Sequence, residues 1–395
     1  MAAAMAEQRS THRPALVLGL LPAGLALVRS LGRAGIPVYG AAFRDNEFGL
    51  RSRFLRGRRV ASSGNERDRD RHLLAFLHEV AGAQRAVLFP ERDEHVDFVL
   101  RNRDEIAEVA DVPLPLDPET VGRLRRKDQL PSTAARAGVD SPATVHAGDE
   151  ESIRAAGLEP PFLLKPVEGQ EYALTFGKKA VVADGVDGAI GIWREAREAG
   201  FEMIVQELIP DSHEDVFSLF TYVGVGGEPL ASVVGRKVRQ GPLRFGTSAV
   251  FEIRFDPRVL ELGQRLLASV GYTGFAHVEL AHDPRDGRFK VLEVNTRTPV
   301  WGGIAMSRSF DIARVAYDDL SGIVRSPLGT YRKEVAWIYL AKDLWVSAQM
   351  ARRRELSPHE FLVHYVRPGK ARAIFAADDP LPALASVGYL RSRLG

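Results

Sequence analysis

The sequence predicts an α/β protein with more than one domain. Three observations carry this prediction. A strand–helix–strand pattern opens the chain, the proline-rich segment VPLPLDP at residues 112–118 has the character of a boundary, and two later segments alternate like the strands of a hairpin. With 395 residues, the chain is long enough for two or three hydrophobic cores.

The opening unit lies in the apolar run ALVLGLLPAGLALV, residues 15–28. Basic residues before this run give it the look of a secretory signal, but Pro22 and Gly24 divide it into a strand, a turn and a helix start. Strands are also predicted at residues 36–43 and 86–90, and a helix at 91–106. The turn GLLPAG lacks both the GxGxxG spacing and the P-loop pattern, so we interpret the unit as a framework with a helix N-terminus that could face an anionic group.

Composition excludes several kinds of site. The 53 Lys and Arg nearly balance 51 Asp and Glu, and no cysteine is present. The near-neutral charge argues against nucleic acid as a partner, with arginine-rich stretches read as solvated faces. The lack of cysteine excludes disulfides, thiolate catalysis and cysteine-held metals, and fits a cytoplasmic protein. No other segment approaches the roughly 20 apolar residues that span a bilayer, so we expect no membrane partner.

After the boundary, the pattern alternates between helices and strands. We predict helices over residues 117–138, 187–199 and 257–270. Strands are predicted at 161–166, 181–183, 203–209, 214–222, 231–240 and 249–253. Lys165 ends the apolar segment PFLLKP, which is unusual because a buried ammonium requires a compensating anion.

The most informative segments are FAHVELA, residues 275–281, and VLEVNTR, residues 291–297, joined by DPRDGR. Alternation gives each segment one polar face, made of His277, Glu279, Glu293, Asn295 and Arg297. A hairpin centred near Asp286 would oppose Glu279 to Glu293 and His277 to Asn295. Opposed carboxylates are unfavourable unless a cation lies between them, and these oxygen ligands suit Mg²⁺. The alternative is an acidic face that meets water, since DPRDGR permits several turn types and registers.

The order of six segments resembles the ATP-grasp superfamily over about residues 117 to 320. The segments are Lys127, LLKP with Lys165, VQELIP, HEDVFSL, FAHVEL and EVNTR. RKVRQGPLRFGT, the extended hairpin and a later DDPLP are similar to the carbamoyl-phosphate-synthase-like branch that includes D-aspartate ligase. The chain departs from that pattern in having few glycines and no serine in the loop of residues 167–179, and Thr296 where proline is usual.

The resemblance implies a domain plan. Residues 1–13 would be a disordered tail and 14–116 a Rossmann-like α/β domain. Residues 117–325 would form a two-lobed ATP-grasp domain with a small mobile lobe at about 160–208. Residues 326–395 would be a C-terminal segment that packs on the core, and a homodimer is possible.

The resemblance also implies roles for individual residues. Lys127 and Lys165 would contact ATP phosphates, while the adenine hinge would comprise Gln206, Glu207, Leu208 and Ile209. Glu214 would accept from the ribose, unless it and Asp215 are exposed loop acids. One or two Mg²⁺ ions, with Mn²⁺ as a substitute, would be held by Glu279, Glu293 and Asn295. Arg297 would steady the transferring phosphoryl group. Alternation lets either Arg236 or Lys237 face a phosphate or substrate carboxylate, and we favour Arg236.

The implied activity is an ATP-dependent carboxylate–amine ligase that works through an acylphosphate. Its substrates would be an amine and an amino acid or small carboxylate. Trp301, Met306 and Arg308 are candidates for an acceptor pocket, with core or surface roles as their alternatives. His277 could act as a base, although a satisfied strand histidine is the simpler reading. A kinase-type ATP-grasp phosphotransferase and a non-catalytic ATP-binding protein remain alternative functions.

Overall fold

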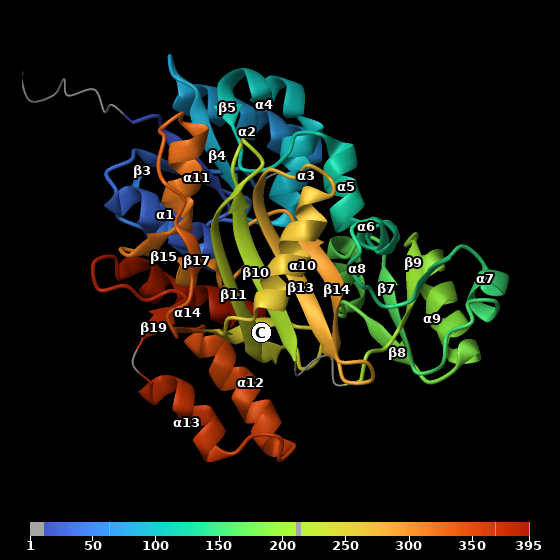
Figure 1. The fold of residues 1–395 in the computed structure, drawn as a ribbon. Coiled ribbons are helices and arrows are strands. Elements are labelled where there is room, and N and C mark those ends of the chain that lie inside the picture. Colours follow the sequence, from blue (N-terminus) through green and yellow to red (C-terminus); the bar gives the residue numbers. More distant parts are fainter. Residues whose placement is uncertain (1–11, 63, 211–214, 368, 395) are drawn as a thin grey trace, which may run out of the picture.

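The computed structural model describes residues 12–394 except for 63, 211–214 and 368 (Figure 1). It confirms the predicted mixture of α and β structure, with a parallel sheet, a larger and mainly antiparallel sheet, and smaller antiparallel sheets. The tail expected over residues 1–13 lies outside the described residues except for His12 and Arg13, and Arg13 hydrogen-bonds the Leu320 carbonyl at 2.7 Å. Among the described helices, none is both long and apolar enough to cross a membrane.

The N-terminal sheet is parallel, with strand order β3-β2-β1-β4-β5. Its strands are β1 (Ala15–Leu18), β2 (Val38–Ala42), β3 (Leu55–Val60), β4 (Ala86–Pro90) and β5 (Ala110–Asp111). Its helices are α1 (Pro22–Arg33), α2 (Glu66–Ala81), α3 (Asp93–Arg101) and α4 (Arg103–Val109). The prediction of a single helix over residues 91–106 is wrong, because the helix is interrupted at Asn102. The side-chain amide of Asn102 donates to Asp70 and to the Phe98 carbonyl. The strand order reverses between β1 and β4, so the carboxyl ends of these two strands flank the crevice where such sheets bind ligands.

A small antiparallel sheet, ordered β6-β9-β7-β8, forms a lobe that projects from the side of the molecule (Figure 1). The strands are β6 (Thr144–Ala147), β7 (Phe162–Pro166), β8 (Val181–Ala183) and β9 (Met203–Glu207). The helices are α7 (Glu150–Arg154), α8 (Gln170–Phe176) and α9 (Val186–Glu198). The segment 167–179, predicted as a loop, contains α8, because Tyr172 buries its ring against the lobe core.

The large sheet runs β14-β13-β10-β11-β12-β18-β19, with β17 beside β11. Its strands are β10 (Val216–Val223), β11 (Pro229–Gly241), β12 (Thr247–Ile253), β13 (Gly274–Asp283), β14 (Arg288–Asn295), β17 (Gly329–Tyr331), β18 (Ala336–Ile338) and β19 (Lys370–Arg372). One face packs on α5 (Pro118–Arg125), α6 (Leu130–Arg136) and α10 (Pro257–Ala268). The other face packs on α1, on the short helix η3 (Gly302–Ala305) and on α11 (Ile312–Leu320). This second face therefore joins the large sheet to the N-terminal part of the chain.

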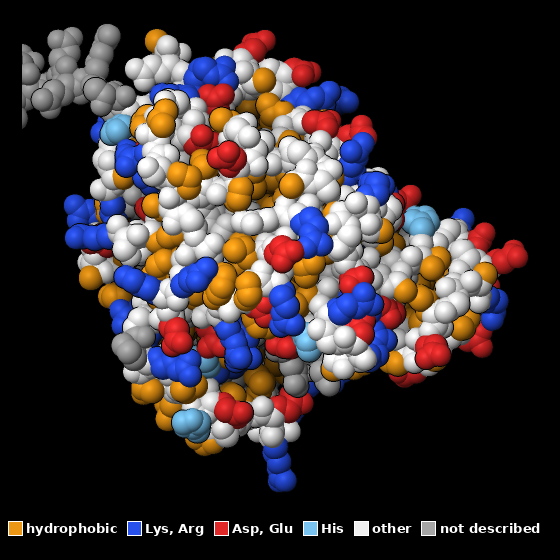
Figure 2. Space-filling view, viewed as in Figure 1, with side chains coloured by type: hydrophobic (Ala, Val, Ile, Leu, Met, Phe, Trp, Pro, Cys, Tyr) orange, Lys and Arg blue, Asp and Glu red, His pale blue; other side chains and the backbone are white. Residues whose placement is uncertain are grey.

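The C-terminal part adds α12 (Leu340–Arg352), α13 (Pro358–Val366) and α14 (Leu381–Leu394), while β18 extends the large sheet. A buried ion pair ties this part to α1, since Arg29 donates to Asp379 at 2.9 Å and both side chains are nearly inaccessible. The Asp379 carboxylate also accepts from the Ser52 hydroxyl and the Arg53 amide. On the face shown in Figure 2, acidic and basic side chains are interspersed rather than gathered by sign.

We expect Asp379→Ala to lower the free energy of unfolding by about 3–5 kcal/mol, because it leaves the buried Arg29 guanidinium without its counter-ion. The neighbouring Asp378→Ala is the matched control. Its partner Arg33 and Asp378 itself are both substantially exposed, so we expect a loss of about 1 kcal/mol or less. Urea unfolding of both variants checks this, and equal losses would contradict the ranking.

Candidate active site

The hairpin β13–β14 has the predicted register at its polar end. His277 pairs with Asn295, and Glu279 pairs with Glu293. The register then shifts by one residue between Glu279 and Leu280. The shift leaves the two carboxylates opposed, and the His277 and Asn295 side chains approach to 3.4 Å. The structure therefore confirms the confrontation of two acids that the sequence predicts.

The two opposed acids have different surroundings. Lys237 donates to Glu279 at 2.9 Å, and the His277 ring lies 3.5 Å from the same carboxylate. Burial by itself raises the pKa of Glu279, but Lys237 and His277 outweigh it and hold this pKa below its usual range. Burial lowers the pKa of His277 to about 4, so this ring is neutral at neutral pH. Among the described residues, Glu293 has no hydrogen-bond or ion-pair partner.

The structure reverses our preference for Arg236 over Lys237. Alternation along β11 puts Lys237 on the face that carries Glu279, and Arg236 on the opposite face, where it donates to Glu252 at 2.7 Å. Sequence alternation separated the two side chains correctly. Only the pairing with β10 and β13 decides which of them reaches the acidic pair.

We predicted that Arg297 shares the polar strand face, but it lies two residues beyond the end of β14. Its guanidinium still donates to the side-chain oxygen Oδ1 of Asn295 at 3.2 Å. It also forms two hydrogen bonds, at 2.9 and 2.8 Å, with the carboxylate of Asp93 at the start of α3. Burial would raise the pKa of Asp93, but Arg297 outweighs this and holds the pKa well below its usual range. Arg297 thus connects the acidic hairpin to the N-terminal sheet.

The two predicted phosphate lysines converge on one place. Lys165 lies near the end of β7, as predicted, and donates to the side-chain oxygen Oε1 of Gln206 at 2.9 Å. Burial lowers the pKa of Lys165 to about 8, although Glu293 acts against this effect. Lys127 lies in the turn between α5 and α6 rather than on the first helix, because α5 ends at Arg125. From this turn its ammonium comes within 3.6 Å of the position that a Cβ would occupy on Gly169, just beyond β7.

The residues present fit a magnesium ion that also binds a substrate phosphate. No group of three or more acids, histidines and cysteines suited to a metal exists within the described ranges. Mg²⁺, however, is commonly held by one or two carboxylates together with phosphate oxygens and water. Glu293, to which the described residues supply no partner, and Glu279 opposite it supply two carboxylates, and Asn295 adds an amide oxygen.

No protein-family model matches the chain. A curated D-aspartate ligase of Enterococcus faecium (strain Aus0004) is 23% identical over 278 residues, which make up 67% of this chain and 66% of that protein. The match thus spans slightly less than two thirds of the relative's length.

Solved structures give the fold. The ADP complex of N5-carboxyaminoimidazole ribonucleotide synthetase (PurK) aligns with a TM-score of 0.64 and 14% identity, covering 86% of this chain and 85% of that one. An L-amino acid ligase from Bacillus licheniformis aligns with a TM-score of 0.59 and 16% identity, covering 79% and 76%. The chain has the ATP-grasp fold. The predicted resemblance to this superfamily, and to D-aspartate ligase within it, is confirmed.

Within the ATP-grasp fold, the segment predicted as the adenine hinge is only partly free. Gln206 is buried between Lys165 and Thr144. The Glu207 amide donates to the Ala143 carbonyl at 2.9 Å, and its carboxylate accepts from the Ala143 amide at 3.1 Å. Ile209 is buried and Leu208 is half-buried. Glu214 lies outside the described residues, and its neighbour Asp215 is 3.8 Å from His282.

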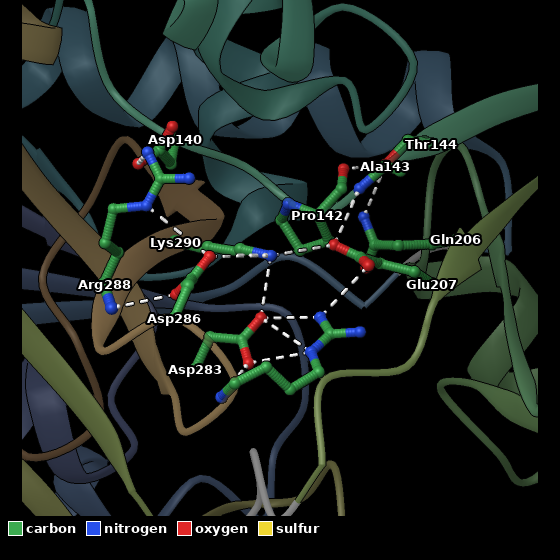
Figure 3. A network of polar contacts seen from close by, with 11 residues as sticks. Asp140, Pro142, Ala143, Thr144, Gln206, Glu207, Asp283, Asp286, Arg288 and Lys290 are labelled. Carbon is green, nitrogen blue, oxygen red and sulfur yellow. Dashed lines mark hydrogen bonds and ion pairs between the residues drawn. The ribbon is translucent and has the colours of Figure 1, made fainter. Parts of the chain in front are cut away.

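The Glu207 carboxylate belongs to a network of ion pairs at the tip of the hairpin (Figure 3). Lys290 reaches Glu207 at 3.1 Å and the fully buried Asp283 at 2.7 Å, while Arg285 bridges the same two acids. The network joins the last strand of the small lobe to β13 and β14 of the large sheet. The Glu207 carboxylate is therefore bound by two cations of the hairpin, Lys290 and Arg285.

Three candidates for the acceptor pocket separate in the structure. Trp301 is buried and stacks on Phe251 with ring centroids 3.7 Å apart, and Met306 lies in the same core cluster. Both therefore take the core role that was their alternative. Arg308 is exposed. Asp93, the partner of Arg297, was not predicted as a site residue from the sequence. Its only signal was its place in the charged segment ERDEH after an apolar strand.

We expect Asp283→Asn to lower the free energy of unfolding by about 1–3 kcal/mol, because Lys290 and Arg285 lose a buried charged acceptor. Asp286→Asn is the control, since Asp286 is partly exposed and only 3.8 Å from Lys290, and it should change stability little. Chemical denaturation of both variants checks this. A stable Asp283→Asn protein would show that the network does not hold the hairpin tip.

Proposed function

We propose that this chain is an ATP-dependent carboxylate–amine ligase, which forms an amide or peptide bond through an acylphosphate and releases ADP and phosphate. The observation that carries the proposal is the opposed pair of Glu279 and Glu293, with Lys165 within electrostatic range of both. The similarity to D-aspartate ligase supports an amide as the product. We expect an amino acid or another small acid as the carboxylate substrate.

The proposed site meets the main difficulty of the reaction, which is to bring an anionic carboxylate to an anionic triphosphate. Mg²⁺ held by Glu279, Glu293 and Asn295 would neutralise phosphate charge. Lys127 and Lys165 would contact the phosphates, and burial strengthens the attraction to Lys165 because the local dielectric is low. The backbone after β9, at Leu208 and Ile209, would contact adenine.

Arg297 and Lys237 are placed to bind the reacting groups. Arg297 is held by Asp93 and Asn295, so its guanidinium is oriented before any substrate arrives. Lys237 lies on the same sheet face as Glu279 and would bind a phosphate or the substrate carboxylate once Glu279 takes a metal. Arg236 is committed to Glu252 on the other face, and we no longer propose it for this role.

The chemistry needs no nucleophile from the protein. A carboxylate oxygen attacks the γ-phosphorus of ATP, the bond to the β-phosphate oxygen breaks, and ADP leaves. The amine nitrogen then attacks the acyl carbon and the carbon–oxygen bond to phosphate breaks, while an N–H proton goes to the departing phosphate. Burial of the reacting groups protects the acylphosphate from water.

A screen of amino acids and small carboxylates, paired with amines in the presence of ATP and Mg²⁺, tests the function. We expect ADP release that requires both partners, with an equal amount of free phosphate and an amide detected by mass spectrometry. Phosphate retained on the substrate would instead establish a phosphotransferase. ATP binding without turnover for any pair would establish a binding protein.

We expect Glu293→Gln to reduce substrate-dependent ADP release by at least about 100-fold, because the variant loses a carboxylate that would hold Mg²⁺ against the triphosphate. Glu228→Gln, an exposed acid between β10 and β11, is the control and should retain full activity. Full turnover by Glu293→Gln would remove the metal assignment.

Nucleotide affinity should fall as the pH rises above about 8. Burial lowers the Lys165 pKa to about 8 in the free protein, and a bound phosphate would raise it, so binding at higher pH must take up a proton. Titration calorimetry of a non-hydrolysable ATP analogue in two buffers of different ionisation enthalpy measures this uptake. Lys165→Met should abolish the uptake near pH 8.5 and Lys178→Met should keep it. Uptake that persists in Lys165→Met would assign the proton to another group.

A further inference from the structure

The carboxyl ends of β1 and β4 meet at the point where the order of the parallel sheet reverses. Gly19 follows β1 and Glu91 follows β4, and the Glu91 amide donates to the Leu18 carbonyl at 3.0 Å. A Cβ on Gly19 would lie 2.5 Å from Oε2 of Glu91 and 2.3 Å from the ring of His95. Gly19 also has φ of +85°, so both backbone and space favour glycine here. The three residues therefore share one small volume at the crevice of the sheet.

Glu91 carries a buried carboxylate, one oxygen of which lacks a hydrogen-bond donor among the described residues. Its residue is 4% exposed, and among the described residues none donates a hydrogen bond to Oε2. The carboxylate is held through the amide of Gly24 in α1. Burial raises the pKa of Glu91 to about 7, even though Arg92 and Arg297 favour the charged form. A buried acceptor in this state is costly unless something cationic reaches it.

The neighbouring titratable groups, Glu47 and His95, already have hydrogen-bond partners. The Glu47 carboxylate accepts from the amides of Leu20, at 2.6 Å, and Phe43, at 3.2 Å. His95 accepts the Arg92 amide on Nδ1, so its proton lies on Nε2, and burial holds its pKa well below the usual value. Burial also raises the pKa of Glu47, but both of its oxygens accept backbone amides. In this part of the described structure, Glu91 is the acid that keeps an oxygen without a donor and can take a proton there.

Arg297 connects Glu91 to the proposed ligase site. The charge of Arg297 interacts with both Glu91 and Glu293, and Asp93, two residues after Glu91, holds the guanidinium in place. A group that binds at Glu91 would therefore interact with the same guanidinium that acts on Glu293.

We propose that Glu91 binds the ammonium group of the amine substrate and accepts its proton before attack. This rests on the proposed ligase function and adds to it the place where a primary amine enters. The ammonium gives one proton to Oε2 of Glu91, which leaves a neutral amine and a neutral carboxylic acid. The amine then forms the carbon–nitrogen bond while the acyl carbon–oxygen bond to phosphate breaks, and its second proton leaves with phosphate.

A purely structural role would make Glu91 the cap of α1, whose N-cap Leu21 has no side-chain hydrogen bond. Glu91→Gln separates the two roles, because the glutamine carbonyl can still accept from Gly24 while the charge and the proton acceptor are lost. The variant should therefore melt close to the wild-type temperature.

The kinetic test compares two nucleophiles with a carboxylate found by the substrate screen. Hydroxylamine is neutral at pH 7 and needs no base, whereas the amine substrate arrives as a cation. We expect Glu91→Gln to keep hydroxamate formation within about threefold of wild type, and to lose amide formation by about 100-fold or more, a typical value for a general base. Equal loss with both nucleophiles would overturn the proposal.

A binding test does not depend on turnover. Ethylamine, which is a cation throughout this pH range and has no carboxylate, should raise the melting temperature of the wild-type protein at pH 8, and the rise should shrink below pH 7 as Glu91 takes up a proton. The rise should be absent in Glu91→Gln. Failure of the substrate screen together with a Glu91-dependent rise would reject the ligase function and keep the cation site. An equal rise in both proteins, or none in wild type, would reject the site.

Discussion

The confrontation of Glu279 and Glu293 on one buried sheet face is the constraint on which the rest of the site depends. Two carboxylates in direct opposition repel each other, and cations from separate elements offset this repulsion. Lys237 on β11 pairs with Glu279, while Lys165 at the end of β7 interacts electrostatically with both acids. A site that collects positive charge around two acids is suited to exchange some of these contacts for a metal ion and a polyphosphate.

Arg297 makes the site a joint between parts of the chain that are distant in sequence. Its ion pair with Asp93 spans the large sheet and the N-terminal unit, and Arg29 and Asp379 tie that same unit to the C-terminal helices. The proposed nucleotide and amine positions would then both interact with one guanidinium. Movement of the N-terminal unit relative to the hairpin would disturb both, so the buried ion pairs outside the site also bear on its geometry.

The network around Glu207 shows how the small lobe is held. Lys290 and Arg285 on the hairpin reach a carboxylate at the end of β9, only one residue from Gln206, which contacts Lys165. The charge balance at the hairpin tip is therefore connected through two adjacent residues to the phosphate lysine. Such surface-accessible ion pairs are individually weak, but the fully buried Asp283 at their centre gives this group a fixed anchor.

The sequence by itself determined which side chains share a strand face, because the two-residue period of a β-strand is local. Alternation and a short turn were enough to oppose Glu279 to Glu293, and the apolar runs were enough to locate β1, β4 and β7. Only the tertiary structure decided which face of β11 meets the acids and that the hairpin tip binds the Glu207 carboxylate. It also decided that Asp93 and Glu91, about 200 residues away in sequence, interact with Arg297. Those outcomes depend on strand neighbours and on packing between separate sheets, and no local pattern encodes them.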